Sequence, residues 1–178
     1  MANLLTAIRL LLALPLAWSM ADPTFLPGLV ILAILIIAVF TDYFDGIVAR
    51  ARGTASPKGM LFDHGTDFLF VTSSLAGAAS VGSVHWLLPA LIVIAFGQYV
   101  LDSYLLFRQK ELRMNFLGRW NGIFYFVPLF GVALSRSIPL DSISNLLTQT
   151  TYFLSLLLII STCASIFDRG LAPFRKTQ

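Results

Sequence analysis

Long apolar runs are the feature that most restricts what this chain can fold into. Six stretches follow one another, each near the roughly 20 residues that a helix needs to cross the hydrocarbon core of a bilayer. They cover residues 3–20, 26–48, 60–82, 86–107, 116–136 and 146–168. No linker or low-complexity tract divides them. We therefore expect one all-α membrane domain over residues 1–178, built from six transmembrane helices.

The composition supports burial of these runs in lipid. Of the 178 residues, 57% are hydrophobic and 12% are charged, whereas a soluble domain has about 25% charged residues. A soluble fold of this size would lack the polar side chains to cover its surface. The net charge of +3 is spread over the ends of the apolar runs, unlike the clustered basic patch of a nucleic-acid-binding protein. The sequence thus predicts an integral membrane protein with no nucleic-acid partner.

The positions of Lys and Arg orient the chain, because cytoplasmic loops are enriched in these residues. Arg9 lies nearest the basic side, and only Arg136 falls on the opposite side. The residues that share the basic side are Arg50, Arg52, Lys58, Arg108, Lys110, Arg113, Arg119, Arg169, Arg175 and Lys176. We therefore expect both termini in the cytoplasm, with the plasma or inner membrane as the location in a bacterial cell.

Four aspartates stand beside the second and third apolar runs, in the stretch "DYFDGIVARARGTASPKGMLFDHGTDF". Asp42 and Asp45 are three residues apart, and Asp63 and Asp67 are four apart, so each pair shares a helix face. The connection between the runs allows the two helices to pack antiparallel, with both pairs at the cytoplasmic end. Ionisable groups in membrane segments are costly and usually functional.

Three interpretations of this acidic group are open. The aspartates could form surface salt bridges with Arg50, Arg52 and Lys58, bind a cation for transport, or hold one or two divalent ions against a diphosphate. Carboxylate oxygens suit Mg²⁺ or Mn²⁺. Gly46 and Gly59 favour the third interpretation. Glycine inside a helix lowers its stability, so two glycines beside the acids suggest that a bulky group approaches the backbone. For both glycines the alternative is a role in helix packing. For Arg50 the alternative to contacting the diphosphate is a role in membrane orientation.

The spacing of these residues resembles a known family signature. The pattern Asp42-x2-Asp45-Gly46-x2-Ala49-Arg50-x8-Gly59-x3-Asp63-x3-Asp67 is similar to that of the CDP-alcohol phosphatidyltransferases. The stretch "NLLTAIR", residues 3–9, is similar to the Asn-x2-Thr-x2-Arg start of several members. The resemblance extends to the six helices and is sharpest over residues 42–67.

The resemblance implies a function and a site. Members transfer a phosphatidyl group from a CDP-linked lipid, such as CDP-diacylglycerol, to an alcohol and release CMP, and they work as homodimers. Two ions, Mg²⁺ or Mn²⁺, would be held by Asp42, Asp45 and Asp63, with Asp67 also near metal and acting as general base. The residues that would contact the donor are Asp42, Gly46, Arg50, Ser56 and Gly59.

The acceptor alcohol, whether small or lipidic, is left open by the sequence. Glycerol-phosphate-using members often have a Leu-Gly-Lys-x-Lys-Thr-like segment after the fourth helix. Here Arg119 keeps a charge, whereas Asn121 and Gly122 replace a basic residue and a hydroxyl. We expect Arg119 and Asn121 in the acceptor pocket. Asp102 is a further intramembrane acid that either orients the alcohol there or pairs with Arg108.

Two rival functions also use acidic residues in a membrane. Prenyl-transferring enzymes bind a metal-bound diphosphate through aspartate pairs, but the chain length and the glycine and arginine positions disfavour them. A divalent-cation transporter would need acids near the bilayer midplane, whereas these gather at one face. Release of CMP from a CDP-lipid separates the three functions, because neither rival produces it.

Overall fold

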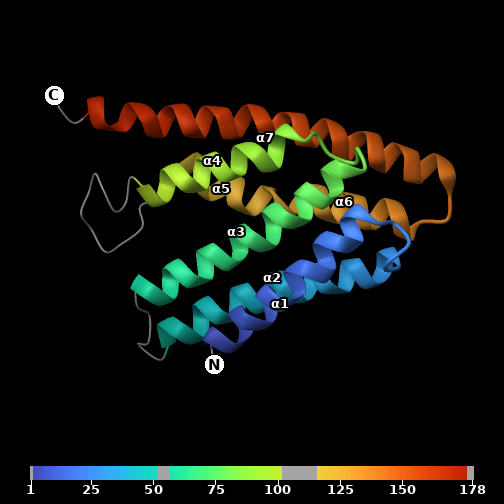
Figure 1. Ribbon diagram of the computed structural model, residues 1–178, viewed down its shortest axis with the longest axis horizontal. Coiled ribbons are helices and arrows are strands. Elements are labelled where there is room, and N and C mark those ends of the chain that lie inside the picture. Colours follow the sequence, from blue (N-terminus) through green and yellow to red (C-terminus); the bar gives the residue numbers. More distant parts are fainter. Residues whose placement is uncertain (1, 52–56, 102–115, 176–178) are drawn as a thin grey trace.

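The computed structural model describes residues 2–51, 57–101 and 116–175, and within these ranges it contains helices and no strand. This confirms the all-α prediction. The helices are α1 (Ala2–Ala21), α2 (Gly28–Ala51), α3 (Pro57–Ser80), α4 (Leu87–Leu101), α5 (Phe116–Phe124), α6 (Phe126–Ser137) and α7 (Asp141–Arg175) (Figure 1).

The helix bounds differ most from the expected segments in the last two of them. The segment expected over 116–136 is divided into α5 and α6 at Tyr125. Pro128 follows one turn after Phe124 and has no N–H to bond that residue's carbonyl, which weakens the helix at this point. The last helix begins at Asp141 rather than 146, because Leu140 accepts hydrogen bonds from the N–H groups of Ile143 and Ser144 and an acid suits a helix N-terminus.

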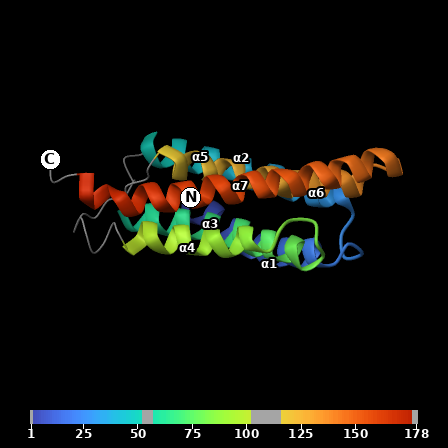
Figure 2. The ribbon, with the colours of Figure 1, turned by 90° about the horizontal axis from the view of Figure 1, so that it is seen from above.

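The helices form an elongated bundle. Viewed from above, α2, α5 and α6 lie along one side and α1, α3 and α4 along the other, with α7 between them in this view (Figure 2). Helix α1 packs against α2 and α3, and α7 packs against α4, α5 and α6. The core includes Leu16, Leu35, Phe70 and Leu129, all fully buried. This packing holds the carboxylate-bearing helices α2 and α3 against the same face of α1.

A close approach between α1 and α3 depends on a glycine. A Cβ atom placed on Gly77 would overlap the carbonyl oxygen of Ala17. Small residues at helix interfaces in membranes allow such backbone contact. Gly77 therefore brings α3 near enough to α1 for their side chains to meet.

The chain direction places the acidic residues at one end of the bundle. Helix α2 ends, α3 begins, and α4 and α7 end on the left of Figure 1. The α1–α2, α3–α4 and α6–α7 connections lie at the other end. There Arg136 donates hydrogen bonds to the carbonyls of Ser19 and, at 2.9 Å, Met20, at the end of α1.

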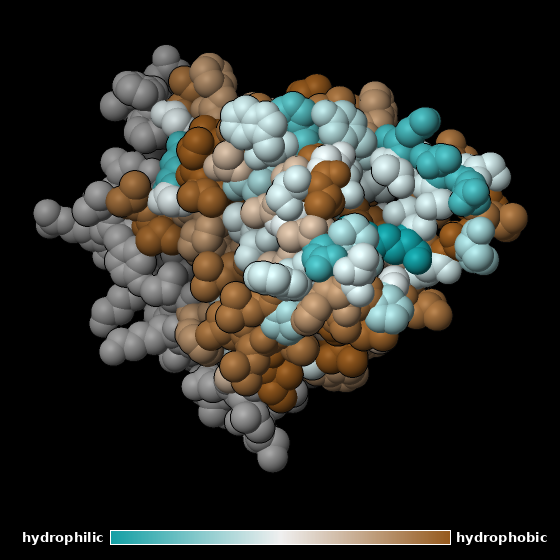
Figure 3. Space-filling model, turned by 45° about the vertical axis from the view of Figure 1, so that its right-hand side comes forward, coloured by the Kyte–Doolittle hydropathy of each residue, from teal (hydrophilic) through white to brown (hydrophobic). Residues whose placement is uncertain are grey.

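The outer surface is strongly apolar. Leu11 and Leu14 of α1 are 75% and 80% exposed, and many further Leu, Ile, Val and Phe side chains point outward. Hydrophobic residues cover broad areas of the face drawn in Figure 3, and the hydrophilic ones gather in its upper right. Soluble monomers rarely expose contiguous apolar patches larger than a few hundred Å². The surface therefore favours contact with lipid.

By length and composition alone, one helix in the described part of the chain is long and apolar enough to cross a membrane, over Asp141–Leu171. Shorter apolar helices cover Thr6–Ala21, Gly28–Phe44 and Leu87–Leu101. This helix and the exposed apolar side chains favour an integral membrane protein.

Candidate active site

Three carboxylates from α2 and α3 converge beside α1, which packs against both helices. Asp42 of α2 and Asp63 and Asp67 of α3 each offer one oxygen, and these oxygens lie within 4.8 Å of one another. The i, i+4 spacing puts Asp63 and Asp67 on one face of α3, and the packing of α1 against both helices brings Asp42 of α2 near them. Such a set of hard oxygen donors fits a Mg²⁺ or Mn²⁺ ion.

A buried arginine from a third helix reaches into this group. Arg9 of α1 is 1% exposed. Its Nη1 donates to Oδ1 of Asp42 at 2.9 Å and to Oδ1 of Asp67, and its Nη2 donates to Oδ1 of Asp63 at 3.2 Å. Thr6, one turn earlier, donates its hydroxyl to the same oxygen of Asp63 at 3.3 Å. One face of α1 thus contacts every described carboxylate of the cluster.

The cluster needs positive charge to be stable. Two carboxylate oxygens no more than 4.8 Å apart repel each other by on the order of 3 kcal/mol at an effective dielectric constant near 20. Water reduces this repulsion for Asp42, which is the most exposed of the three. One guanidinium against three carboxylates leaves a formal charge of two negative units on the described groups. That remainder matches the charge of one divalent ion.

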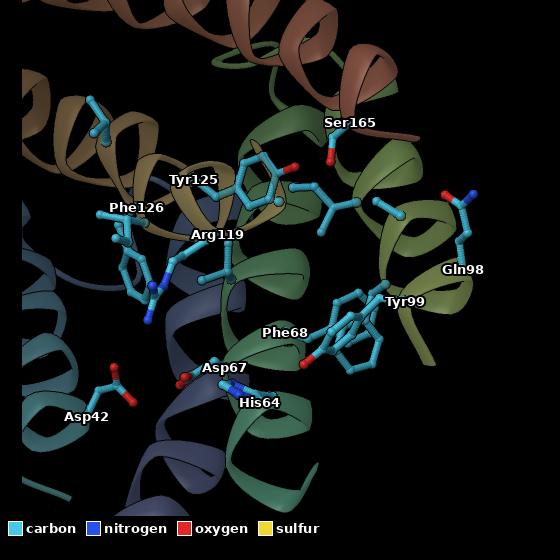
Figure 4. Close-up of a pocket in the computed structure, with 18 of the residues that line it drawn as sticks. Asp42, His64, Asp67, Phe68, Gln98, Tyr99, Arg119, Tyr125, Phe126 and Ser165 are labelled. Carbon is cyan, nitrogen blue, oxygen red and sulfur yellow. The ribbon is translucent and has the colours of Figure 1, made fainter. Parts of the chain in front are cut away.

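A cavity of about 650 Å³ adjoins the carboxylates. Asp42, Asp67 and His64 lie at one end of it, and Phe68 of α3 stacks on Phe96 of α4, at 4.1 Å between ring centroids, in its wall. Figure 4 shows the aspartates on α2 and α3, with α4, α5 and α7 forming the other sides. The space is wide enough for a substrate-sized molecule.

Two arginines line the cavity, one from each of two helices. Arg119 of α5 and Arg169 of α7 both line it, and in Figure 4 the Arg119 side chain extends toward the end of the cavity that holds Asp42 and Asp67. Arg169 lies over the ring of Tyr99, 5.1 Å from its centroid, a geometry that stabilises a cation on an aromatic face. The cavity therefore combines an acidic end with two cations that can bind an anion.

The family assignment follows from comparison with known sequences. The family model described as "CDP-alcohol phosphatidyltransferase" matches residues 1–167. The chain belongs to the CDP-alcohol phosphatidyltransferase family. This match confirms the family resemblance based on the aspartate motif. The matched residues include nearly all of the described helices.

Two curated relatives of this chain are named for their activities. A CDP-diacylglycerol–glycerol-3-phosphate 3-phosphatidyltransferase of Mycoplasma genitalium is 30% identical over 66% of this chain and 54% of its own length. A probable phosphatidylglycerophosphate synthase of Mycobacterium tuberculosis is 31% identical over 52% of this chain and 46% of its own. The chain thus spans about half the length of these relatives. No solved structure matches it.

The structure brings some of the predicted site residues to the cavity and directs one away from it. It brings Asp42, Asp63 and Asp67 together and sets Arg119 in the cavity wall. Asn121 was expected in the acceptor pocket, but it is buried and accepts a hydrogen bond from the Ser161 hydroxyl at 2.6 Å, and it does not line the cavity. Its position on α5 turns it toward α7 instead.

Several predicted residues lie at positions where the structure describes no side chain. Ser56 and Asp102 lie outside the described residues, as does Arg108, the alternative partner of Asp102. Other predicted residues lie in helices whose side chains are not described at these positions: Asp45, Gly46 and Arg50 in α2, and Gly59 in α3. Their roles stay predictions from the motif.

Sequence reasoning missed two residues of the site. Arg9 served only to orient the first helix and to extend the family resemblance, although an ionisable residue inside an apolar run is itself a signal of function. Arg169 counted only as a basic residue at a helix end. Nothing in its spacing from the motif indicates that α7 brings it to the cavity.

Proposed function

We propose that this protein transfers a phosphatidyl group from a CDP-linked lipid, such as CDP-diacylglycerol, to an alcohol and releases CMP. The observation that carries the proposal is the convergence of Asp42, Asp63 and Asp67 beside a cavity that Arg119 and Arg169 also line. Family membership and the activities for which the relatives are named support it. The acids would face the donor diphosphate, and the arginines an anionic acceptor.

The proposed reaction is a displacement at phosphorus. The acceptor hydroxyl oxygen forms a bond to the phosphorus that bears the diacylglycerol, and the bond from that phosphorus to the CMP oxygen breaks. The hydroxyl proton passes to a carboxylate, and CMP leaves with the bonding electron pair. Asp67 fits the role of base, because it belongs to the acidic cluster and also lines the cavity. A base needs such access to the reacting hydroxyl.

Metal ions belong to this proposal. Asp42, Asp63 and Asp67 would hold Mg²⁺ or Mn²⁺, with Asp45 as the further ligand that the motif implies for a second ion. Bound divalent ions neutralise charge on a diphosphate and on the departing oxygen. Asp42, Gly46, Arg50, Ser56 and Gly59 would contact the CDP portion of the donor.

The acceptor that the cavity fits best carries a phosphate. Arginine binds phosphate through its planar fork of N–H groups, and two arginines line the cavity. The Mycoplasma genitalium relative is named for glycerol 3-phosphate. We therefore propose glycerol 3-phosphate or a similar phosphorylated alcohol, although Asn121 and Gly122 depart from the usual segment of glycerol-phosphate-using members.

Purified protein tests the proposal directly. It is offered CDP-diacylglycerol with Mg²⁺ or Mn²⁺ and one alcohol at a time: glycerol 3-phosphate, inositol phosphate, serine or phosphatidylglycerol. We expect CMP release that depends on both metal and acceptor, with glycerol 3-phosphate most active. Metal-dependent binding of the donor with no CMP release for any alcohol would leave only the fold in common with the family. CMP release for a neutral alcohol alone would overturn the assignment of the acceptor.

The same proposal includes an arrangement in the membrane. Six spans are inferred, with α5 and α6 together forming one, both termini in the cytoplasm and the acidic site at the cytoplasmic face. The ends of α2, α4 and α7 and the start of α3 lie at the same end of the bundle, which supports this arrangement. A homodimer is implied by the family resemblance, and native mass spectrometry that finds monomers only would contradict it.

A further inference from the structure

Arg9 stands apart from the other charged side chains of the described residues because it is fully buried. It is 1% exposed, and it comes from α1, whereas the carboxylates that it contacts come from α2 and α3. Burial of a charge is costly unless it is paired and hydrogen-bonded. The three aspartates supply that pairing.

The guanidinium lies where the carboxylates converge. It donates to the Oδ1 atoms of Asp42, Asp63 and Asp67, and these three residues also form the candidate metal cluster. A divalent ion between them would draw on the same three groups. It would also lie close to a permanent positive charge, because arginine does not lose its proton in proteins.

We propose that Arg9 is a positioning residue that competes with divalent ions for the three aspartates. It holds the carboxylates together while no ion is bound, and it lowers the affinity of the assembled site for the ion. This inference rests on the proposed function, because it assumes that the cluster binds metal. It gives α1 a role in metal binding that the acidic motif of α2 and α3 does not include.

The competition follows from charge and from geometry. The planar guanidinium presents several N–H donors in a fixed fork, so that one side chain reaches three carboxylates. Thr6 on the same face of α1 adds a neutral hydrogen bond to Asp63. If Arg9 is removed, the carboxylates face one another without this cation, and the metal-free protein becomes less stable. An ion that binds then relieves more repulsion and meets no competing charge.

The test compares Arg9→Met with the wild type in detergent micelles or nanodiscs. Mn²⁺ binding is measured by electron paramagnetic resonance, and thermal unfolding is measured by tryptophan fluorescence with Mg²⁺ or with EDTA. We expect Arg9→Met to bind Mn²⁺ at least about ten-fold more tightly, which corresponds to about 1.4 kcal/mol. Its Tm should fall in EDTA and recover with Mg²⁺ by more than the wild-type Tm rises.

Arg136→Met is the matched control. Arg136 is an arginine at the opposite end of the bundle that contacts backbone carbonyls rather than carboxylates. Its loss should lower the Tm by the same amount with Mg²⁺ and with EDTA, and it should leave Mn²⁺ affinity unchanged. A purely structural role for Arg9 would produce this same pattern in Arg9→Met.

Further outcomes distinguish the inference from the proposed function. Wild-type or weaker Mn²⁺ affinity in Arg9→Met overturns the role of Arg9 and leaves the metal site intact. A wild-type protein that binds no Mn²⁺ contradicts the metal site itself, and the inference with it. If Arg9→Met yields no folded protein with Mg²⁺ or with EDTA, Arg9→Lys is used for the test instead. Lysine keeps the charge without the fork, so we expect Mn²⁺ affinity about three-fold tighter than wild type, and unchanged or weaker affinity overturns the inference.

Discussion

At the scale of single residues, one cavity is lined by groups of both charges. Asp67 belongs to the carboxylate cluster and also lines the cavity, whereas Asp63 belongs to the cluster alone. Arg119 and Arg169 lie in the walls contributed by α5 and α7. This combination suits a reaction in which a carboxylate base adjoins both a diphosphate and an anionic acceptor.

Asp67→Asn tests the base. The amide keeps the shape of the side chain but accepts no proton, so we expect CMP release to fall by roughly 10²–10⁴-fold, while stabilisation of the fold by CDP-diacylglycerol partly survives. Turnover is measured as CMP release, and donor binding as the shift in Tm. Asp141→Asn, an exposed acid at the start of α7, is the control and should remain active. Full activity of Asp67→Asn would remove Asp67 from this role.

Arg119→Gln and Arg169→Gln test the anion site. A hydrogen bond to a charged group contributes about 1.5–3 kcal/mol, so loss of either cation should raise the KM for glycerol 3-phosphate by about ten-fold or more. The KM for CDP-diacylglycerol serves as the internal control and should change little. Equal increases in both KM values would place these arginines at the donor rather than at the acceptor.

At the scale of helices, the site depends on how closely α1, α2 and α3 pack. Three helices contribute the contacting groups, and none of the three alone carries both the acids and their buried cation. The contact between Gly77 and Ala17 sets the separation of α1 and α3. Backbone packing therefore determines whether Arg9 reaches Asp63 and Asp67.

Gly77→Ala should push α3 away from α1, because the added methyl group would overlap the Ala17 carbonyl. We expect a loss of about 1–3 kcal/mol in the free energy of unfolding, as for other overpacked interiors, together with a lower Tm. Gly97→Ala is the matched control, since nothing lies within 4 Å of the place that its methyl group would take. It should be neutral or stabilising by up to about 1 kcal/mol. Similar losses in both variants would indicate that helix packing is not the cause.

At the scale of the whole molecule, the two ends of the bundle differ in chemistry. One end, where α2, α4 and α7 finish, holds the acidic cluster, Arg119 and Arg169. At the other end Arg136 donates a hydrogen bond to the last turn of α1. Between them the surface is largely apolar. Such a molecule can stand across a bilayer with its site open to one side.

Cysteine labelling in intact cells tests this orientation. Cys163 is first changed to serine, which leaves no other cysteine in the chain, and single cysteines then replace Thr24, Leu140 or Gln178. We expect a membrane-impermeant maleimide to label the Thr24 and Leu140 positions, which are exposed in two connections at the same end of the bundle. Position 178 should react only after permeabilisation. Labelling of position 178 alone in intact cells would reverse the orientation.

Sequence patterns determined much of this protein, because they depend on local spacing. Apolar runs predicted the helices, and the i, i+3 and i, i+4 spacing of the aspartates predicted shared helix faces and, with the glycines, the family. The point at which α5 gives way to α6 was missed, since Pro128 acts within an otherwise apolar run.

Tertiary structure alone decided which side chains meet. Each residue turns a helix by about 100°, so Arg119 and Asn121, two residues apart, lie on nearly opposite faces of α5, and the rotation of this helix about its axis decides which of them faces the cavity. No spacing in the sequence fixes that rotation. Helix packing also brought Arg9, 33 residues from Asp42 and 58 from Asp67, between the carboxylates, because a charge that is buried in a bundle is stable only where opposite charges converge.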